Sequence, residues 1–306
     1  MMPEPHVVRR GRGTPLIVLH GNGVDHRLLL SLDHVFADGP WERIFIDLPG
    51  FGGTAALTGT GGLIELACWL ESAVDALLGE GPFAILANSL GGLLALHLTA
   101  RLGTRVFGLA LIAPVVEPDR ARRTLPARTV VERDDAVLAS LPPADREAFT
   151  DVAVRQTAES WAMFRDHALP GIRAADGEAM ARLARHYRLD DGPSLGSLRF
   201  EGPTVIVTGR QDHVVGFRDQ FELLDRFDAA SYVVVDGAGH NVHLEQPDLV
   251  DALLREWAHR VVSTGKSAPG AAPGAGTGAA TVAVDRAPIT ADEDVDTGEH
   301  RSGNHP

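Results

Sequence analysis

Short apolar runs and longer amphipathic runs alternate along most of this chain. The short runs are almost wholly apolar, as strands buried on both faces of a parallel sheet are. In the longer runs, apolar residues recur every three or four positions, which predicts helices with one buried face. We expect strands over 16–19, 44–47, 83–87, 106–112, 204–208 and 232–235, and helices over 63–78, 90–101, 217–227 and 246–262. The alternation predicts an α/β fold with a mostly parallel, doubly wound sheet.

One interval, from 116 to 197, interrupts this alternation. It has no strand pattern, and several prolines divide it. Helical patterns recur within it, at 136–141, 146–164 and 178–187. Because long loops without structure are uncommon in compact domains, we expect a helical cap inserted between two core strands. The predicted organisation is a core over 1–115 and 198–262, with the cap over 116–197.

The composition changes at residue 263. Residues 267–279 are almost wholly Gly, Ala, Pro, Ser and Thr, and residues 285–306 are polar and acidic. Such a sequence cannot bury enough apolar surface to offset the entropy lost on ordering. We therefore expect 263–306 to form a disordered acidic tail.

Charge and composition narrow the possible partners. The 306 residues carry a formal net charge of −13, and no segment gathers Lys and Arg into a stripe. This excludes a nucleic-acid groove and a surface for anionic membranes. No apolar run approaches the roughly 20 residues that span a bilayer, and residues 1–12 lack the apolar stretch of a signal peptide. We expect a cytoplasmic protein without a membrane partner, and the sequence leaves its oligomeric state open.

Cys68 is the single cysteine, so no intrachain disulfide is possible. It lies in the apolar run of the helix expected over 63–78, where we expect it to act as a small buried hydrophobe. His259, His300 and His305 are too isolated in the sequence to form a ligand set. We therefore expect neither a metal nor an organic cofactor.

The clearest chemical motif surrounds Ser89. This serine stands between the expected strand over 83–87 and the expected helix over 90–101, with Ala87 two residues before it and Gly91 two residues after it. Small neighbours at this spacing indicate a nucleophile elbow, in which a tight strand-to-helix turn exposes the serine. The amide of Leu90, at the helix N-terminus, would face the negative charge that develops in an acyl-transfer reaction.

A second motif supplies the other half of an oxyanion hole. The expected strand over 16–19 ends in His20 and Gly21, and the amide of Asn22 would face that of Leu90. Gly23 is the competing donor if the loop is wider. We expect His20 to fix this loop by hydrogen bonding rather than to act as a base.

Two further loops complete a possible catalytic triad. Asp212 follows the expected strand over 204–208, and His240 follows the last expected strand within a glycine-flanked loop. Since parallel strands end at one sheet edge, Ser89, Asp212 and His240 should meet there, in the chain order nucleophile, acid, base. Glu117 and Asp119, which follow the strand over 106–112, are the rival acids.

Together these motifs resemble the α/β-hydrolase superfamily over residues 1–265, apart from the cap. Residues 47–54 look like the family's turn after its fourth strand, and residues 239–247 are similar to its last loop. The resemblance implies an α/β-hydrolase fold with a helical cap. Asn88 before the serine is similar to hydrolases that cleave carbon–carbon bonds in ring-fission products, whereas Asn241 stands where those enzymes carry a tryptophan.

The expected activity is that of a carboxylesterase-like serine hydrolase, which cleaves an ester or similar acyl bond of a small hydrophobic substrate through an acyl-enzyme. Cap residues that could contact it, or pack on one another, are Phe149, Trp161, Met163, Phe164 and Leu169. Arg155 and Arg165 are cap candidates for binding a carboxylate. The alternatives are a carbon–carbon bond hydrolase of ring-fission diketones, a cofactor-free haloperoxidase or perhydrolase, and a binding protein on a hydrolase scaffold.

Overall fold

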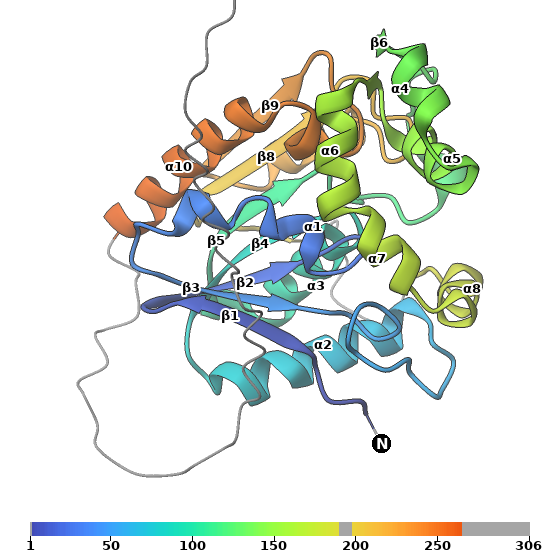
Figure 1. Cartoon of the computed structure of the whole chain (residues 1–306). Coiled ribbons are helices and arrows are strands. Elements are labelled where there is room, and N and C mark those ends of the chain that lie inside the picture. Colours follow the sequence, from blue (N-terminus) through green and yellow to red (C-terminus); the bar gives the residue numbers. More distant parts are fainter. Residues whose placement is uncertain (1, 190–197, 265–306) are drawn as a thin grey trace, which may run out of the picture. The chain divides into compact units, whose positions relative to one another are not determined.

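A computed structural model describes residues 2–189 and 198–264 (Figure 1). The acidic tail predicted from residue 263 therefore lies almost entirely outside the described residues, as do the last eight residues of the predicted cap, 190–197.

A seven-stranded sheet forms the centre of the protein. In spatial order its strands are β1 (Val7–Gly11), β3 (Trp41–Ile46), β2 (Thr14–Leu19), β4 (Phe83–Asn88), β5 (Val106–Ile112), β8 (Thr204–Gly209) and β9 (Ala230–Val235). All neighbours are parallel except β1, which pairs with β3 in the antiparallel direction. The six predicted strands and the mostly parallel α/β fold are confirmed. β1 was missed because this edge strand is half exposed and carries two arginines.

Helices cover both faces of the sheet, and the alternation of strand side chains decides what each helix meets. From β2, Ile17 and Leu19 pack with α2 (Leu63–Leu78) and α3 (Leu90–Leu102). Leu16 and Val18 point to the opposite face, toward α10 (Pro247–Ser263) and the 3₁₀ turn η1 (Asp33–Phe36). A short helix, α1 (Arg27–Leu30), follows β2.

Two local predictions need correction. The segment expected to be helical over 217–227 forms only a 3₁₀ turn, η5 (Asp219–Asp225), with bonds closed over three residues. Cys68 is exposed rather than buried, because the buried face of α2 runs through Leu66, Leu70 and Val74 and leaves the cysteine on the solvent side.

Between β5 and β8 the chain forms a mainly helical segment. Its elements are η3 (Arg120–Arg122), β6 (Glu132–Arg133), α4 (Asp135–Ser140), α5 (Pro143–Val152), β7 (Arg155–Gln156), α6 (Ala158–His167), α7 (Leu169–Ala174) and α8 (Gly177–Arg185). The helix expected over 146–164 is interrupted at 153–157, where the two-residue strand β7 pairs with β6. The expectation of no strand in this interval was therefore wrong. Phe149, Trp161 and Phe164 pack on one another, with ring centroids 5.3 to 6.1 Å apart.

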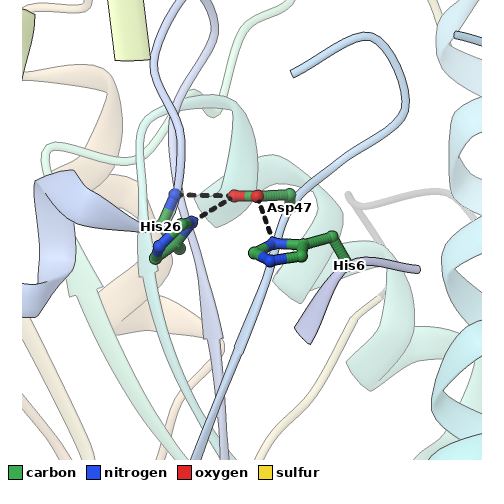
Figure 2. A group of neighbouring side chains, drawn as sticks. All are labelled: His6, His26 and Asp47. Carbon is green, nitrogen blue, oxygen red and sulfur yellow. Dashed lines mark hydrogen bonds and ion pairs between the residues drawn. The ribbon is translucent and has the colours of Figure 1, made fainter. Parts of the chain in front are cut away.

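A buried carboxylate, Asp47, joins the N-terminal segment to the loops that follow β2 and β3 (Figure 2). Its Oδ2 accepts hydrogen bonds from His6 Nδ1 at 2.7 Å and from the Gly53 amide at 2.9 Å. Its Oδ1 accepts from both the amide and the Nδ1 of His26, at 2.8 and 2.9 Å. Burial alone would raise the pKa of Asp47, but hydrogen bonds from His26 and Gly53 outweigh it and hold the pKa well below its usual range.

We expect Asp47→Asn to destabilise the fold by about 2–4 kcal/mol at pH 7, because an amide cannot accept all four of these hydrogen bonds. The depressed pKa adds stability that is complete above about pH 4, the usual carboxyl range, and is lost as the pH falls below it. Urea unfolding at pH 7 and pH 3 should therefore show a smaller acid loss in this variant than in the parent. Asp38→Asn, at an exposed position, is the control. Equal stability and equal acid loss in parent and Asp47→Asn would contradict this role.

Candidate active site

The three residues of the predicted triad lie in loops at the carboxyl ends of β4, β8 and β9. His240 Nδ1 donates a hydrogen bond to Asp212 Oδ2 at 2.9 Å. The other oxygen of Asp212 accepts from the amides of Val214 and Val215, at 2.8 and 3.0 Å, so the fully buried carboxylate is fixed in position. With its proton on Nδ1, the imidazole keeps Nε2 available to accept a proton.

Ser89 lies in a strained turn between β4 and α3. Its φ of 51° and ψ of −114° place a non-glycine residue in a region that L-residues rarely adopt. The turn is held by a bond from the Ser89 amide to the Ile112 carbonyl and by bonds from the amides of Leu93 and Val115 to the Ser89 carbonyl. Ser89 and His240 line the same cavity, of about 280 Å³. A strained strand-to-helix turn of this kind is what the sequence-based prediction of a nucleophile elbow requires.

Two glycines allow the close approaches on which this arrangement depends. A side chain at Gly91 would overlap the carbonyls of Leu19 and His20, so only glycine lets α3 start against the end of β2. A side chain at Gly209 would overlap the carbonyls of Ala238 and Gly239, in the loop that leads to His240. The end of β8 and the histidine loop therefore pack backbone to backbone, which brings Asp212 within reach of the imidazole.

The loop after β2 places the predicted oxyanion donors beside the serine. Asn22 and Ser89 line the same two cavities. The loop also approaches the serine closely, because a Cβ at Gly21 would lie 3.1 Å from the Cβ of Ser89. Neither the amide of Asn22 nor that of Leu90 donates a hydrogen bond to an acceptor among the described residues. Both amides are thus available to an oxyanion, while Gly23 also borders the smaller cavity.

His20 fixes this loop, as the sequence predicted. Its Nδ1 donates to the Gly21 carbonyl at 2.7 Å, and its Nε2 accepts from the Leu48 amide at 2.9 Å. These partners define a neutral ring, and burial lowers the pKa of His20 in the same sense. His20 therefore ties the Asn22 loop to the turn after β3.

The rival acids do not contact the histidine. Glu117 forms an ion pair with Arg122 at 3.2 Å and accepts from the Asp119 amide. The Asp119 carboxylate accepts from the amide of Ala121. Asp212 is the carboxylate that the structure places on His240.

Glu245 is a residue whose role the sequence did not reveal. Its buried carboxylate accepts from the amides of Val154, Arg155 and Gly239, at 2.7, 3.2 and 2.6 Å. Burial raises the pKa of Glu245, and the three amide donors oppose that rise. One carboxylate thus connects the segment between β5 and β8 to the residue just before His240. The only sequence signal was its place in the motif over 239–247.

His243, three residues after His240, is fully buried, and neither ring nitrogen has a hydrogen-bond partner within residues 2–189 and 198–264. Burial lowers the pKa of His243 to about 3, and the neighbouring His240 and His167 act in the same direction. The ring is therefore neutral at physiological pH, and no proton transfer is assigned to it.

A single group of side chains in the described chain brings three possible metal ligands together, His6, His26 and Asp47, with ligand atoms within 4.8 Å of one another. The Asp47 oxygens already accept four hydrogen bonds there. These bonds explain why the three side chains lie together, since they connect three segments of the fold. None of the described helices has the length and apolarity needed to cross a membrane.

Comparisons with known proteins identify a matching family and a matching fold. A family model described as "Alpha/beta hydrolase family" matches residues 16–253. A pimeloyl-[acyl-carrier protein] methyl ester esterase from Shewanella sp. is 32% identical over 111 residues, which span 36% of this chain and 39% of that relative. An (E)-2-((N-methylformamido)methylene)succinate hydrolase from Acinetobacter baylyi is 21% identical over 82% of this chain and 93% of its own length. The crystal structure of an alpha/beta superfamily hydrolase from Oenococcus oeni PSU-1 superposes with a TM-score of 0.79 at 22% identity, covering 86% of this chain and 98% of that one.

The unpartnered ring of His243 predicts a specific pH dependence of stability. Since its folded pKa of about 3 lies below the ordinary 6.5, the unfolded chain gains the proton first as the pH falls. This group therefore costs stability progressively from pH 6.5 down to pH 3, on the order of 3 kcal/mol at pH 4. We expect His243→Leu to flatten the fall in unfolding free energy between pH 7 and pH 4.

The matched control is His259→Leu, because His259 is exposed on α10. It should leave the pH dependence as in the parent. Urea unfolding curves at half-unit pH steps measure the difference, and identical slopes for His243→Leu and the parent would refute the assignment.

Proposed function

Because this chain belongs to the alpha/beta hydrolase family, we propose that it is a serine esterase with Ser89 as nucleophile, His240 as general base and Asp212 as the acid that orients the base. The observation that carries the proposal is the 2.9 Å contact between His240 Nδ1 and Asp212 Oδ2, in a loop that borders the cavity of Ser89. The strained backbone of Ser89 supports the same assignment, since such strain is typical of nucleophile elbows.

In this mechanism Ser89 Oγ attacks the acyl carbonyl while His240 Nε2 takes the hydroxyl proton. Asp212 holds the imidazole in the tautomer with Nδ1 protonated and stabilises the imidazolium that forms. The oxyanion accepts hydrogen bonds from the amides of Asn22 and Leu90, each worth about 10²–10³ in rate. His240 then protonates the leaving alcohol, and water releases the acyl group by the reverse path.

The segment over 116–197 would act as the cap of this site. Its helices α5, α6 and α7 line the cavity of about 280 Å³ through Ala148, Phe164 and Ile172, and Ala168 lines it between α6 and α7. A cavity of this size and apolarity suits a small organic group. The partner we propose is accordingly a small-molecule acyl substrate.

An ester is favoured over the other bond types by the relative from Shewanella, which is a methyl ester esterase. That match spans 39% of the relative, so its substrate is not transferred to this chain. A carbon–carbon bond hydrolase would use the same triad, and Asn88 supports that second candidate. A coloured dienoate substrate tests it: turnover of the dienoate without turnover of esters would replace the esterase proposal.

We expect Ser89→Ala to lower the turnover of short p-nitrophenyl esters by about 10⁴-fold or more, because no nucleophile remains. A fluorophosphonate probe should label the parent and fail to label this variant. Ser72→Ala, at an exposed serine on α2, is the control and should keep both activities. Full turnover by Ser89→Ala would disprove the nucleophile. Failure of the parent to react with the probe or the esters would favour a binding protein on the same scaffold.

The acid is tested by a pair of variants. Asp212→Asn should lower kcat by about 10³–10⁴-fold, because an amide does not hold the histidine in the required tautomer. Glu117→Gln should change kcat little, since its partner is Arg122. Steady-state kinetics on a p-nitrophenyl ester measures both, with circular dichroism to verify folding. A larger loss of kcat in Glu117→Gln than in Asp212→Asn would instead identify Glu117, which follows β5, as the acid.

A further inference from the structure

Two cavities meet at Ser89, and their chemistry differs. Ser89 and Asn22 border both of them. The smaller, about 280 Å³, also has His240 on its wall and is otherwise mostly apolar. Besides Ser89 and Asn22, the larger cavity, about 550 Å³, is lined by the segment after β5, by the end of α8 with the residues that follow it, and by the loop after β8. A substrate bound at Ser89 therefore has two differently lined spaces for the two sides of its scissile bond.

The position of His240 decides which side of an ester enters which cavity. In the proposed mechanism the imidazole must donate its proton to the leaving oxygen, so that oxygen lies on the His240 side of Ser89. His240 borders the smaller cavity and does not border the larger. The alcohol part then occupies the smaller cavity, and the acyl chain extends into the larger. This step rests on the proposed function.

The larger cavity carries an excess of positive charge. Four arginines line it, Arg120, Arg123, Arg185 and Arg188, against one carboxylate, that of Asp119. Within the described part of the chain, no carboxylate pairs with Arg120, Arg185 or Arg188. Asp119 is itself engaged by the amide of Ala121. Guanidinium groups that gather in a concave site, without a carboxylate partner among the described residues, are suited to bind a carboxylate or phosphate.

Arg123 is the most firmly placed of the four. Its guanidinium donates to the carbonyls of Glu117, Val214 and Pro118, at 2.8, 3.0 and 3.0 Å. Burial lowers the pKa of Arg123, which indicates a charge held partly away from water. Beside it, burial raises the pKa of Tyr187 to about 12, so its hydroxyl stays protonated and can donate. Preorganised donors of this kind lose little entropy when an anion binds.

The smaller cavity has the opposite character. Its walls carry apolar side chains such as Leu28, Phe164 and Ile172, and its one carboxylate, Asp151, would repel an anion. Asp151 is near Arg128, at 3.3 Å, which does not border the cavity. Neutral groups are therefore favoured on the alcohol side and anionic groups on the acyl side.

We propose that the larger cavity binds the acyl part of the substrate and that its arginines recognise an anionic group, carboxylate or phosphate, at the far end of the acyl chain. The preferred substrate is then a short alkyl ester of an acyl chain that ends in an anion. The esterified alcohol is small and uncharged.

Three methyl or acetyl esters of equal chain length test this orientation. Monomethyl suberate carries its anion on the acyl side, methyl octanoate has no anion, and 8-acetoxyoctanoate carries the anion on the alcohol side. We expect kcat/KM for monomethyl suberate to exceed that for either of the others by about tenfold or more, and the advantage to shrink as salt is added. Methyl 8-phosphonooxyoctanoate distinguishes between a carboxylate and a phosphate as the anionic group. A kcat/KM above that for monomethyl suberate would identify a phosphate-bearing acyl chain.

Variants connect the preference to the arginines. Two variants are compared, Arg123→Gln and the double variant Arg120→Gln with Arg188→Gln. Each should lower the ratio of kcat/KM for monomethyl suberate to kcat/KM for methyl octanoate by about tenfold, mainly by raising KM for monomethyl suberate. The double variant changes only exposed side chains, so we expect it to fold like the parent, which circular dichroism verifies. Arg12→Gln, at an exposed arginine outside both cavities, is the control and should keep the ratio.

The outcomes separate this inference from the esterase proposal. Three results would overturn the inference while leaving the esterase proposal in place. They are equal kcat/KM for monomethyl suberate and methyl octanoate, a higher kcat/KM for 8-acetoxyoctanoate, and an unchanged ratio in both arginine variants. Hydrolysis of none of the esters, together with no fluorophosphonate labelling of Ser89, would overturn both.

Discussion

The parallel direction of the strands from β3 to β9 is the constraint on which the rest of this structure depends. Because these strands share a direction, the loops that carry Asn22, Ser89, Asp212 and His240 all leave the sheet at one edge. The central strands are covered on both faces by helices, so their positions are set by packing over their whole length. A rigid edge of this kind can hold a strained serine turn and a histidine–carboxylate hydrogen bond in a fixed position.

Buried carboxylates then join these loops to one another. Asp47, Asp212 and Glu245 each accept hydrogen bonds from backbone amides. Each also bonds to a residue distant in the sequence, Asp47 to His6, Asp212 to His240 and Glu245 to Val154. Removing an ionised carboxylate from water is costly, and several donors are needed to offset that cost. The donors come from loops that would otherwise be independent, so every such carboxylate couples the positions of two or three loops. Glu245 is the clearest case, because the same side chain fixes the start of β7 and the loop before His240.

The sequence was sufficient for features determined by local pattern. The six predicted strands follow from short apolar runs, and five of them are buried along most of their length. Ser89, Asp212 and His240 were proposed as the catalytic residues because each follows such a run. Features determined by distant contacts were missed. The helix expected over 146–164 breaks where the amides of Val154 and Arg155 bond to Glu245, some 90 residues away. A helical period gives no indication of such a partner, and the amphipathic pattern over 217–227 likewise did not reveal a 3₁₀ turn.

The charged wall of the larger cavity is a further feature that no local pattern contains. Arg155 and Arg165, the cap arginines suggested by the sequence, pair instead with Glu132 and Asp166. The arginines that line the cavity come from two stretches, 120–123 and 185–188, which the fold alone brings together.

The positive charge of the larger cavity is opposite in sign to the net charge of the whole molecule. With a formal net charge of −13, the protein repels anions at long range, so long-range attraction does not bring an anionic substrate to the site. At physiological ionic strength such repulsion is screened within about 8 Å, whereas guanidinium groups in a concave site act by direct contact. Recognition would therefore depend on whether an anion fits against these four side chains once the acyl chain has entered. Such a device selects by affinity at the site and adds little to the rate of encounter.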